Sequence, residues 1–296
     1  MEIRVLRYFL EAAREGNITR AAAHLHLSQP TITRQIHQME EELGVKLFTR
    51  GSVNIRLTRE GLLLKERAQE IIDLEEKTRA DLSSVQKNIS GTVCIGAGET
   101  SGIRFVGRVM KKLRDLYPDV RCRMISGDQE GVVEKLDKGL IDFGVFVGKV
   151  DLEKYDFFVL PDVDTWGVLL LKDAPLVKQG FVRPEDLLGH PLLSSYQAMS
   201  EGEFVEWLGY PVEKLNIVGL YNLIYNASVM VREGLGIALT LEGLINTTGN
   251  TPLRFVPLNP RITARLVLAW RKGVMFCPAA GKFLEIAKEE LCPIRT

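Results

Sequence analysis

Polar side chains in residues 28–38 are the first groups whose types and spacing could do chemistry. Thr31, Thr33 and Arg34 lie off an apolar stripe, and their hydroxyl and guanidinium groups can bond the edges of base pairs. An arginine can hold guanine O6 and N7 with two hydrogen bonds. Residues 17–59 contain six basic and three acidic residues, whereas basic and acidic residues balance at 38 each over the chain. The local pattern, and not the net charge, therefore indicates a nucleic-acid surface.

The run from Gly96 to Gly102 is the second candidate, because it follows a strand-like segment and opens a helix-like one. Free N–H groups at a helix start attract anions, and Thr100 and Ser101 add hydroxyl donors. We expect these two residues to bind a carboxylate or another small anion, with ordinary helix capping as the alternative. Glu99 would oppose an anion if its side chain faced the same space. The run departs from a dinucleotide-binding fingerprint, since its third glycine is displaced by one position.

Motifs of enzyme chemistry are missing from the sequence. It contains no Gly-x-Ser-x-Gly, His-Glu-x-x-His or phosphate-loop motif. Only His190 lies outside the first 60 residues, and its position before a proline is typical of a loop. We therefore expect no catalytic residue, no metal site and no cofactor. An enzyme with a DNA-binding appendage is the alternative that these observations disfavour.

The four cysteines give a further alternative, a thiol redox sensor. Such a sensor needs an exposed thiol of low pKa near a second thiol. Cys94 and Cys122 lie within predicted strands, where they could be neighbours across a sheet. Cys277 and Cys292 flank a predicted helix, about 20 Å apart at 1.5 Å per residue. DNA binding with and without peroxide would distinguish a redox sensor from a small-molecule sensor.

The apolar segments predict a cytoplasmic protein. No segment reaches the 18 apolar residues that a membrane helix needs, and charges interrupt the apolar residues of 1–17, unlike a signal peptide. We therefore expect no membrane partner and reduced thiols.

Three helices must position the polar face of residues 28–38. Apolar residues at helical spacing predict a first helix that Gly16 ends, and Asn17 can cap a short second helix. Ser28 can cap a third helix, which runs to about Leu43 before Gly44.

Two short runs after these helices, 45–48 and 54–57, predict a small hairpin. Helices joined by a tight turn and followed by a hairpin are typical of a winged helix-turn-helix. A three-helix bundle with a polar surface fits the same pattern.

A long helix follows, which Thr58 can cap and which is predicted to continue to about Lys87. Its apolar positions alternate spacings of four and three, which indicates a heptad seam with flaws at Glu75 and Thr78. The helix could pair two copies of the chain or pack on its own domain. The seam consists of Leu64, Ala68, Ile71, Glu75, Thr78, Leu82 and Val85.

Beyond a boundary at residues 88–91, strand-like and helix-like runs alternate, which predicts an α/β fold with mostly parallel sheets. Strands are expected at 92–96, 120–124, 141–146, 166–171, 192–195, 215–218 and 236–239. Helices are expected near 102–116, 129–138, 200–208 and 222–233.

Residues 3–62 resemble the DNA-binding region of the LysR-type transcriptional regulators without insertion or gap. The matching residues are Phe9, Ala21, Ala22, Leu25, Ser28, Gln29, Pro30, Ile36, Glu40, Leu43, Gly44, Leu47, Phe48, Arg50, Leu57, Thr58 and Gly61. The resemblance implies a bacterial regulator that binds double-stranded DNA as a homodimer or homotetramer. It also implies activation of a target promoter, with RNA polymerase as a further partner.

The resemblance also implies the domain layout. An N-terminal all-α winged helix-turn-helix (1–58) and a linker helix for dimerisation (59–88) would precede an effector-binding domain (91–296). That domain would be a periplasmic-binding-protein-like pair of α/β subdomains, joined by crossing strands near 160–166 and 262–268. Subdomain I would take about 91–162 and 266–296, and subdomain II about 163–265.

Carried over by position, the resemblance implies which residues meet DNA. The recognition helix would begin at Ser28 and enter the major groove, while other side chains bind phosphates. The expected DNA-binding residues are Thr19, Ser28, Gln29, Pro30, Thr31, Thr33, Arg34, Arg50 and Arg56. For Arg50, bracing the wing is the alternative to a phosphate contact. The wing tip, 51–54, lacks the basic residue that many family members carry, so Arg56 is the expected basic substitute.

The effector would bind between the two subdomains and shift the balance between two states of the regulator. Its expected ligands are loop residues after strand ends, where open α/β sheets bind small molecules. They are Thr100, Ser101, Gly102, Ser126, Gln129, Phe146, Gly148, Ser194, Ser195 and Asn222.

Overall fold

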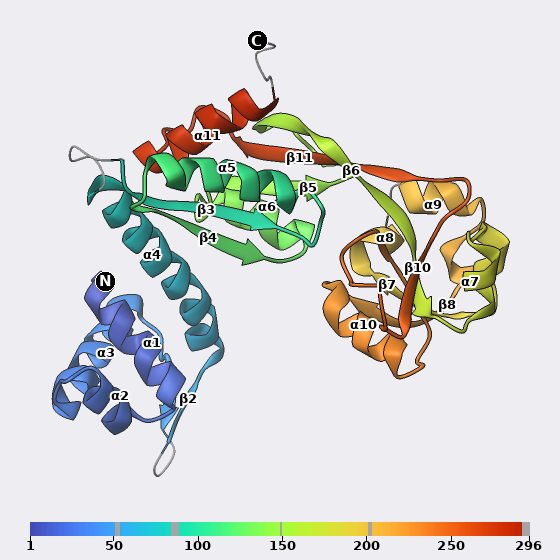
Figure 1. Cartoon of the computed structure of the whole chain (residues 1–296). Coiled ribbons are helices and arrows are strands. Elements are labelled where there is room, and N and C mark those ends of the chain that lie inside the picture. Colours follow the sequence, from blue (N-terminus) through green and yellow to red (C-terminus); the bar gives the residue numbers. More distant parts are fainter. Residues whose placement is uncertain (51–53, 84–88, 149, 201–202, 292–296) are drawn as a thin grey trace. The chain divides into compact units, whose positions relative to one another are not determined.

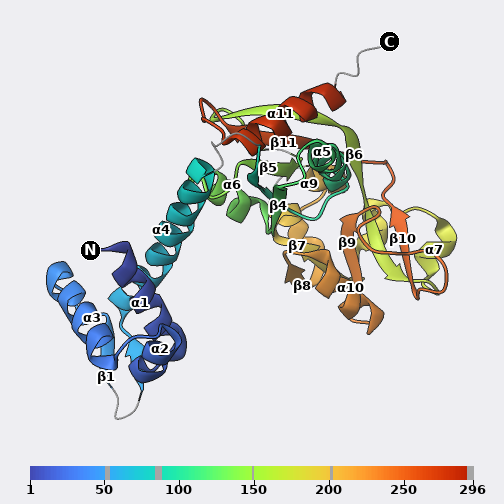
Figure 2. The same cartoon turned by 60° about the vertical axis from the view of Figure 1, so that its left-hand side comes forward.

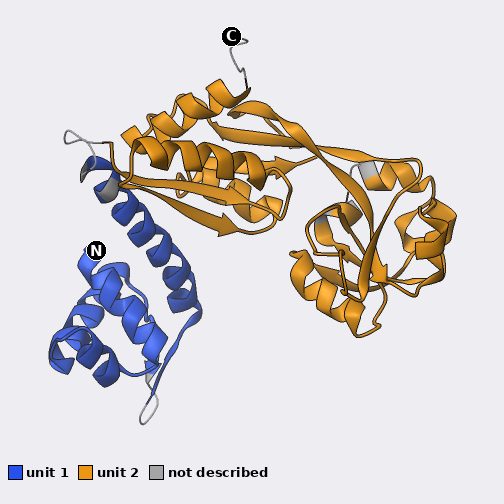
Figure 3. Ribbon diagram, viewed as in Figure 1, with its two compact units in different colours: residues 1–82 blue, residues 83–296 orange. Residues whose placement is uncertain are grey.

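The computed structural model describes residues 1–50, 54–83, 89–148, 150–200 and 203–291. The chain divides into two compact units, Met1–Leu82 and Ser83–Thr296 (Figure 3). Each unit is described by itself.

Three helices open the first unit, and their caps are those that the sequence predicts. They are α1 (Ile3–Glu15), α2 (Ile18–His24) and α3 (Gln29–Leu43). Gly16 takes the left-handed conformation after α1, with φ of 59°, and Gly44 does so after α3, with φ of 68°. The Asn17 carboxamide accepts from two N–H groups of α2, and the Ser28 hydroxyl accepts from the Thr31 N–H. The predicted helix boundaries are therefore confirmed.

The hairpin pairs β1 (Phe48–Arg50) with β2 (Ile55–Leu57) in antiparallel register. Its first strand starts at Phe48, so the expected strand at 45–48 is wrong. The reason is local, because the N–H groups of Leu47 and Phe48 donate to the Glu40 carboxylate instead of to a partner strand. The wing tip, 51–53, lies outside the described residues.

Helix α4 (Arg59–Ser83) begins where Thr58 caps it. The Thr58 hydroxyl accepts from the Gly61 N–H at 2.9 Å, which confirms the predicted cap. Gly61 is required here, since a Cβ at this position would lie 2.1 Å from the Leu47 carbonyl oxygen. Early in α4, Ala68 and Ile72 are buried in the core of the first unit. The expected helix end near Lys87 lies outside the described residues.

The second unit is built on one nine-stranded sheet in the described part of the chain. Its order is β4-β3-β5-β11-β6-β9-β7-β8, with β10 paired to β6. The strands are β3 (Gly91–Ala97), β4 (Val120–Ser126), β5 (Phe143–Val147), β6 (Tyr155–Leu171), β7 (Pro191–Ser195), β8 (Asn216–Tyr221), β9 (Ile237–Leu241), β10 (Leu253–Pro257) and β11 (Thr263–Arg271).

The helices of the second unit cover both faces of this sheet. They are α5 (Ile103–Leu116), α6 (Gln129–Asp137), α7 (Pro175–Gln179), α8 (Tyr196–Ser200), α9 (Glu203–Leu208), α10 (Ile224–Arg232) and α11 (Pro278–Leu291). Helices α5 and α11 pack with β3 and β5 in one core, whereas α6 packs on the opposite face. Helices α8 and α9 pack on one face of the strands around β7, and α10 packs on the other.

Strands β6 and β11 join the two helix-covered groups and run side by side in both views (Figures 1 and 2). The crossing segments expected near 160–166 and 262–268 lie in this antiparallel pair. The pair of α/β subdomains implied by the resemblance is therefore confirmed. The expectation of mostly parallel sheets is wrong, because β6, β10 and β11 run antiparallel to their neighbours.

None of the described helices is both long enough and apolar enough to cross a membrane.

Candidate nucleic-acid interface and ligand cavity

The polar face of α3 is open, as the sequence predicts. Ser28, Gln29, Pro30 and Arg34 are exposed, whereas Thr31 and Thr33 are half-buried. The opposite face buries Ile32, Ile36, Met39 and Glu40. The first two turns of α3 thus bring together six of the nine expected DNA-binding residues.

Hydrogen bonds fix most of these side chains on the helix. The hydroxyl oxygens of Ser28 and Thr31 lie 2.7 Å apart, and the Gln29 amide donates to the Thr33 hydroxyl at 2.9 Å. Among the residues that the structure describes, none forms a hydrogen bond or ion pair with the Arg34 side chain. Its guanidinium donors therefore face solvent and are open to an external acceptor.

The other three expected residues lie on separate elements. Thr19 is exposed in the first turn of α2, and Arg56 is exposed on β2. The backbone of Arg50 pairs with Ile55, but its side chain lies outside the described part of the structure.

Glu40 positions the wing, a role that sequence reasoning missed. Its side chain is 8% exposed and accepts from the Leu47 N–H at 2.8 Å and from the Lys46 ammonium at 2.8 Å. Burial opposes the charged form, but these hydrogen bonds outweigh it and hold the pKa of Glu40 below its usual value. The signal was available, because Glu40 follows Ile36 by four residues and so falls on the buried stripe.

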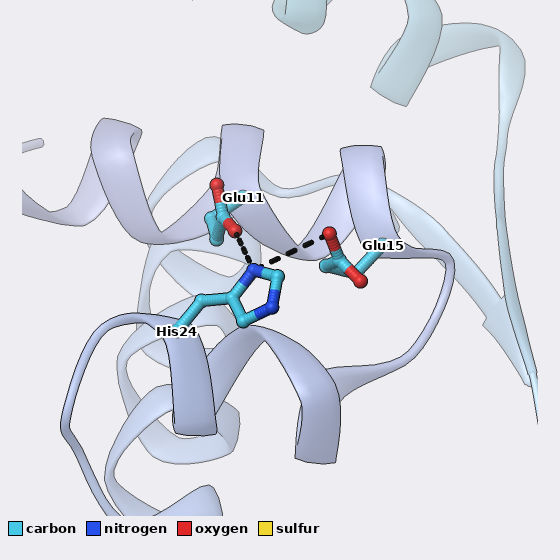
Figure 4. Close-up of side chains that lie close together, drawn as sticks. All are labelled: Glu11, Glu15 and His24. Atoms are coloured by element: carbon cyan, nitrogen blue, oxygen red, sulfur yellow. Dashed lines mark hydrogen bonds and ion pairs between the residues drawn. The ribbon is translucent and has the colours of Figure 1, made fainter.

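A polar cluster joins α1 to α2 in the first unit (Figure 4). His24 Nδ1 lies 3.0 Å from a Glu11 carboxylate oxygen and 3.4 Å from a Glu15 carboxylate oxygen. A metal ion would suit two carboxylates and an imidazole at this spacing. However, the Arg14 guanidinium already lies 2.6 Å from Glu11 and 3.3 Å from His24 Nδ1. The Arg20 guanidinium lies 3.6 Å from Glu15, so both carboxylates of the cluster are already paired with cations of the protein.

A cavity of about 280 Å³ lies in the second unit. Four of the ten expected effector residues line it: Gln129, Gly148, Ser195 and Asn222. Its wall also includes the aromatic side chains of Trp166, Tyr196, Phe204 and Tyr221. Sequence reasoning missed Trp166, Phe204 and Tyr221, because their spacing along the chain is irregular, whereas Tyr196 lies in the expected loop 194–196.

The other six expected residues do not line the cavity. Phe146 is 2% exposed in the core beneath α6, and Ser194 is fully buried. Ser126 ends β4, and the cavity begins at the next residue, Gly127. Gly102 is also buried, where a Cβ would lie 3.2 Å from Leu266.

Thr100 and Ser101 do bind a carboxylate, but it belongs to the protein. The Thr100 hydroxyl donates to Asp164 at 2.6 Å, and the Ser101 N–H donates to the other Asp164 oxygen at 3.1 Å. Asp164 is 1% exposed. The Gly102 N–H donates to the Thr100 hydroxyl at 3.1 Å, so Thr100 also accepts a hydrogen bond from the backbone just before α5.

Two further carboxylates line the cavity. Glu99 accepts from the Ile224 N–H at the start of α10, and Asp128 accepts from the Gly131 N–H at 3.0 Å at the start of α6. The Glu99 side chain therefore does face the space in which an anion was expected.

The polar atoms of the aromatic wall differ in their partners. The Tyr221 hydroxyl donates to the Leu239 carbonyl, and burial raises its pKa well above the usual value. The Trp166 indole N–H is buried without a hydrogen-bond partner among the described residues.

The cysteine geometry does not favour a redox sensor. Cys122 lies opposite Val93 in the β3–β4 register, and Cys94 lies opposite Arg123. Since successive side chains of a strand point to opposite faces, the two thiols lie on opposite faces of the sheet. Partial burial raises the pKa of Cys122, whereas a sensor thiol needs a lowered pKa. Cys292 lies outside the described residues.

Family models match nearly all of the chain. The model of the bacterial regulatory helix-turn-helix protein, lysR family, matches residues 3–62, and that of the LysR substrate binding domain matches residues 86–292.

Individual relatives and solved structures agree with these models. The Hca operon transcriptional activator HcaR of Escherichia coli is 28% identical, with 99% of each chain covered. The regulator YwbI of Bacillus subtilis is 29% identical, with 98% of this chain and 97% of that protein covered. The fold matches that of CbnR in complex with its target DNA, with a TM-score of 0.77 at 19% identity over 98% of this chain and 99% of the other. The chain therefore belongs to the LysR family of transcriptional regulators, and it is a DNA-binding regulator with an effector-binding domain.

Proposed function

We propose that the first two turns of α3 read operator DNA in the major groove, with Arg34 as the principal base-reading residue. The supporting observation is that the Arg34 guanidinium is exposed and makes no hydrogen bond with a described residue. Thr31 and Thr33 lie beside it and supply hydroxyl groups. Thr19, Gln29 and Arg56 bind phosphates, which position the unit without reading sequence.

The test compares two duplexes, one that the wild-type chain selects from a random pool and one with the same bases scrambled. Arg34→Ala is expected to weaken binding to the selected duplex by roughly 10- to 100-fold, since a bidentate arginine contributes about 1–3 kcal/mol. Binding to the scrambled duplex changes little. Arg114→Ala, on the exposed side of α5 in the other unit, is the matched control. An unchanged ratio of the two affinities in Arg34→Ala would contradict the proposal.

Helix α4 pairs two copies of the chain in this proposal. Ile71, Leu74 and Leu82 are 38%, 44% and 70% exposed on one side of α4, an apolar surface that a second copy would cover. A paired regulator places two recognition helices on two half-sites. Leu74→Glu is expected to shift the chain toward monomer in sedimentation, whereas Glu66→Lys on another face of the helix does not. Equal behaviour of the two variants would argue against pairing through this surface.

The effector binds in the cavity of the second unit, with Gln129, Gly148, Ser195 and Asn222 among its ligands. Support comes from the mixed polar and aromatic lining, which is typical of small-molecule sites. A bound effector shifts the balance between two regulator states by its difference in affinity for them. We propose that one of these states activates the target promoter through RNA polymerase, and that the chain itself catalyses no reaction.

A further inference from the structure

Three helix starts lie at or next to the cavity, and each is a place where an anion would ordinarily bind. The cavity wall includes Asp128 and Gln129 at the start of α6 and Ile224 at the start of α10. It also includes Gly98 and Glu99, in the loop before α5. Unpaired N–H groups and the helix dipole make such positions attractive to carboxylates and phosphates.

The protein's own carboxylates occupy all three positions. Asp164 accepts from the Thr100 hydroxyl and the Ser101 N–H before α5. Glu99 accepts from the Ile224 N–H at α10, and Asp128 accepts from the Gly131 N–H at α6. An anionic ligand would have to displace one of these groups or lie beside it.

The charged residues of the cavity lining also disfavour an anionic ligand. Glu99 and Asp128 are the charged residues among the lining positions that the structure describes, and no described lining residue is Lys, Arg or His. A ligand carboxylate would therefore meet like charge without a compensating cation, which is costly away from bulk water.

The aromatic wall and the volume define the size and the apolar part of the ligand. Trp166, Tyr196, Phe204 and Tyr221 are the aromatic residues of the lining. A volume of about 280 Å³ exceeds the roughly 150 Å³ cavity that holds benzene, so one ring with a short polar substituent fits. Aromatic faces also attract cations.

We propose that the cavity selects an uncharged or cationic ring-bearing effector over a carboxylate of the same shape. This inference rests on the proposed function, in which the cavity is the effector site. Glu99 is the specificity-determining residue, since its carboxylate lines the cavity and accepts from α10 at the same time.

Benzamidine, benzamide and benzoate are matched probes, because each joins the same ring to a planar three-atom group with a charge of +1, 0 or −1. Ligand-observed NMR titration of the full chain measures their affinities. Benzamidine and benzamide are expected to bind at least roughly tenfold more tightly than benzoate. A preference for benzoate would overturn the proposed ligand class and leave the effector function standing. Binding of none of the three would remove the cavity as a ligand site, and the proposed effector function with it.

Glu99→Gln tests whether the charge of Glu99 causes the preference among the three probes. The amide oxygen of the variant still accepts from the Ile224 N–H, while the charge is removed. The variant is expected to bind benzoate several-fold more tightly and benzamidine several-fold more weakly, with benzamide unchanged. Glu233→Gln, at the exposed C-terminal end of α10, is the matched control and should leave all three affinities unchanged. Thermal melts of both variants establish that they are folded. Identical probe affinities in Glu99→Gln and Glu233→Gln would overturn the role of Glu99.

Discussion

The polar face of α3 and the loop before α5 differ in whether their hydrogen-bonding groups already have a partner within the protein. Arg34 is exposed and makes no hydrogen bond with a described residue, so its donors await an external acceptor. Thr100 and Ser101 instead bond to Asp164, a carboxylate of the same chain. An exposed donor stays bonded to water at no cost, whereas a buried one without a partner costs about 1–3 kcal/mol. An open face can therefore keep its donors free for a ligand, and a buried loop cannot.

The largest expected effect comes from removing the internal carboxylate. Asp164→Ala leaves the Thr100 hydroxyl and the Ser101 N–H without their acceptor, and is expected to lower the free energy of unfolding of the second unit by about 3 kcal/mol. Urea unfolding measures this change. Asp164→Asn, which keeps an acceptor oxygen, should lose clearly less. Equal losses in the two variants would show that packing, and not the hydrogen bonds, sets the stability of this loop.

The second prediction concerns Glu40, which, unlike the exposed Arg34, is buried and bonded within the first unit. Glu40→Ala is expected to lower the free energy of unfolding of this unit by about 2 kcal/mol at pH 7, since the Leu47 N–H loses a charged acceptor. Because folding lowers the pKa of Glu40, its contribution is present above the usual carboxyl pKa of about 4.3 and is lost as the pH falls through the lowered value.

Urea unfolding of wild type and Glu40→Ala at pH 7 and at lower pH measures that dependence. The difference between the two proteins should shrink as Glu40 is protonated. A difference that stayed constant with pH would contradict the electrostatic account.

The third prediction concerns Arg56 on β2, and it asks whether the wing, like α3, uses an exposed cation to contact DNA. If Arg56 binds one phosphate, Arg56→Ala should reduce the slope of log affinity against log salt by about 0.9 and weaken binding to selected and scrambled duplexes alike. A salt series on both duplexes measures the slope. An unchanged slope would leave the wing without a phosphate contact at this residue.

The smallest effect is expected at the cluster of His24, which is exposed, with the half-buried Glu11 and Glu15. His24→Ala should change the free energy of unfolding by less than about 1 kcal/mol, since exposed ion pairs contribute little. Thermal melts with and without zinc provide the check. A rise in melting temperature with zinc in wild type, absent in His24→Ala, would instead identify a metal site.

Sequence patterns predicted the first unit far better than the cavity, and the reason is the range of the interactions. The caps at Asn17, Ser28 and Thr58 involve residues two or three positions away, so local spacing contains the information. The hydrogen bond from Ile224 to Glu99 joins residues 125 positions apart. No local pattern indicates such a pairing.

The same argument explains the individual errors. The strand expected at 45–48 fails because Glu40, seven residues before Leu47, takes the N–H groups that a partner strand would have bonded. The strand that contains Phe146 was predicted correctly, but the strand pattern does not show that the Phe146 side chain packs in the core beneath α6. The expected loop 126–129 does line the cavity through Gly127, Asp128 and Gln129, although Ser126 itself does not.

The most direct test of the central claim is a dimethyl sulfate footprint on the duplex that the wild-type chain selects. This reagent methylates guanine N7, the atom that a bidentate arginine covers in the major groove. We expect wild type to protect at least one guanine in each half-site, and Arg34→Ala to leave that guanine reactive at a concentration where the duplex is fully bound. The same guanines protected by both proteins would show that another group reads the sequence, and would contradict the role of the open face of α3.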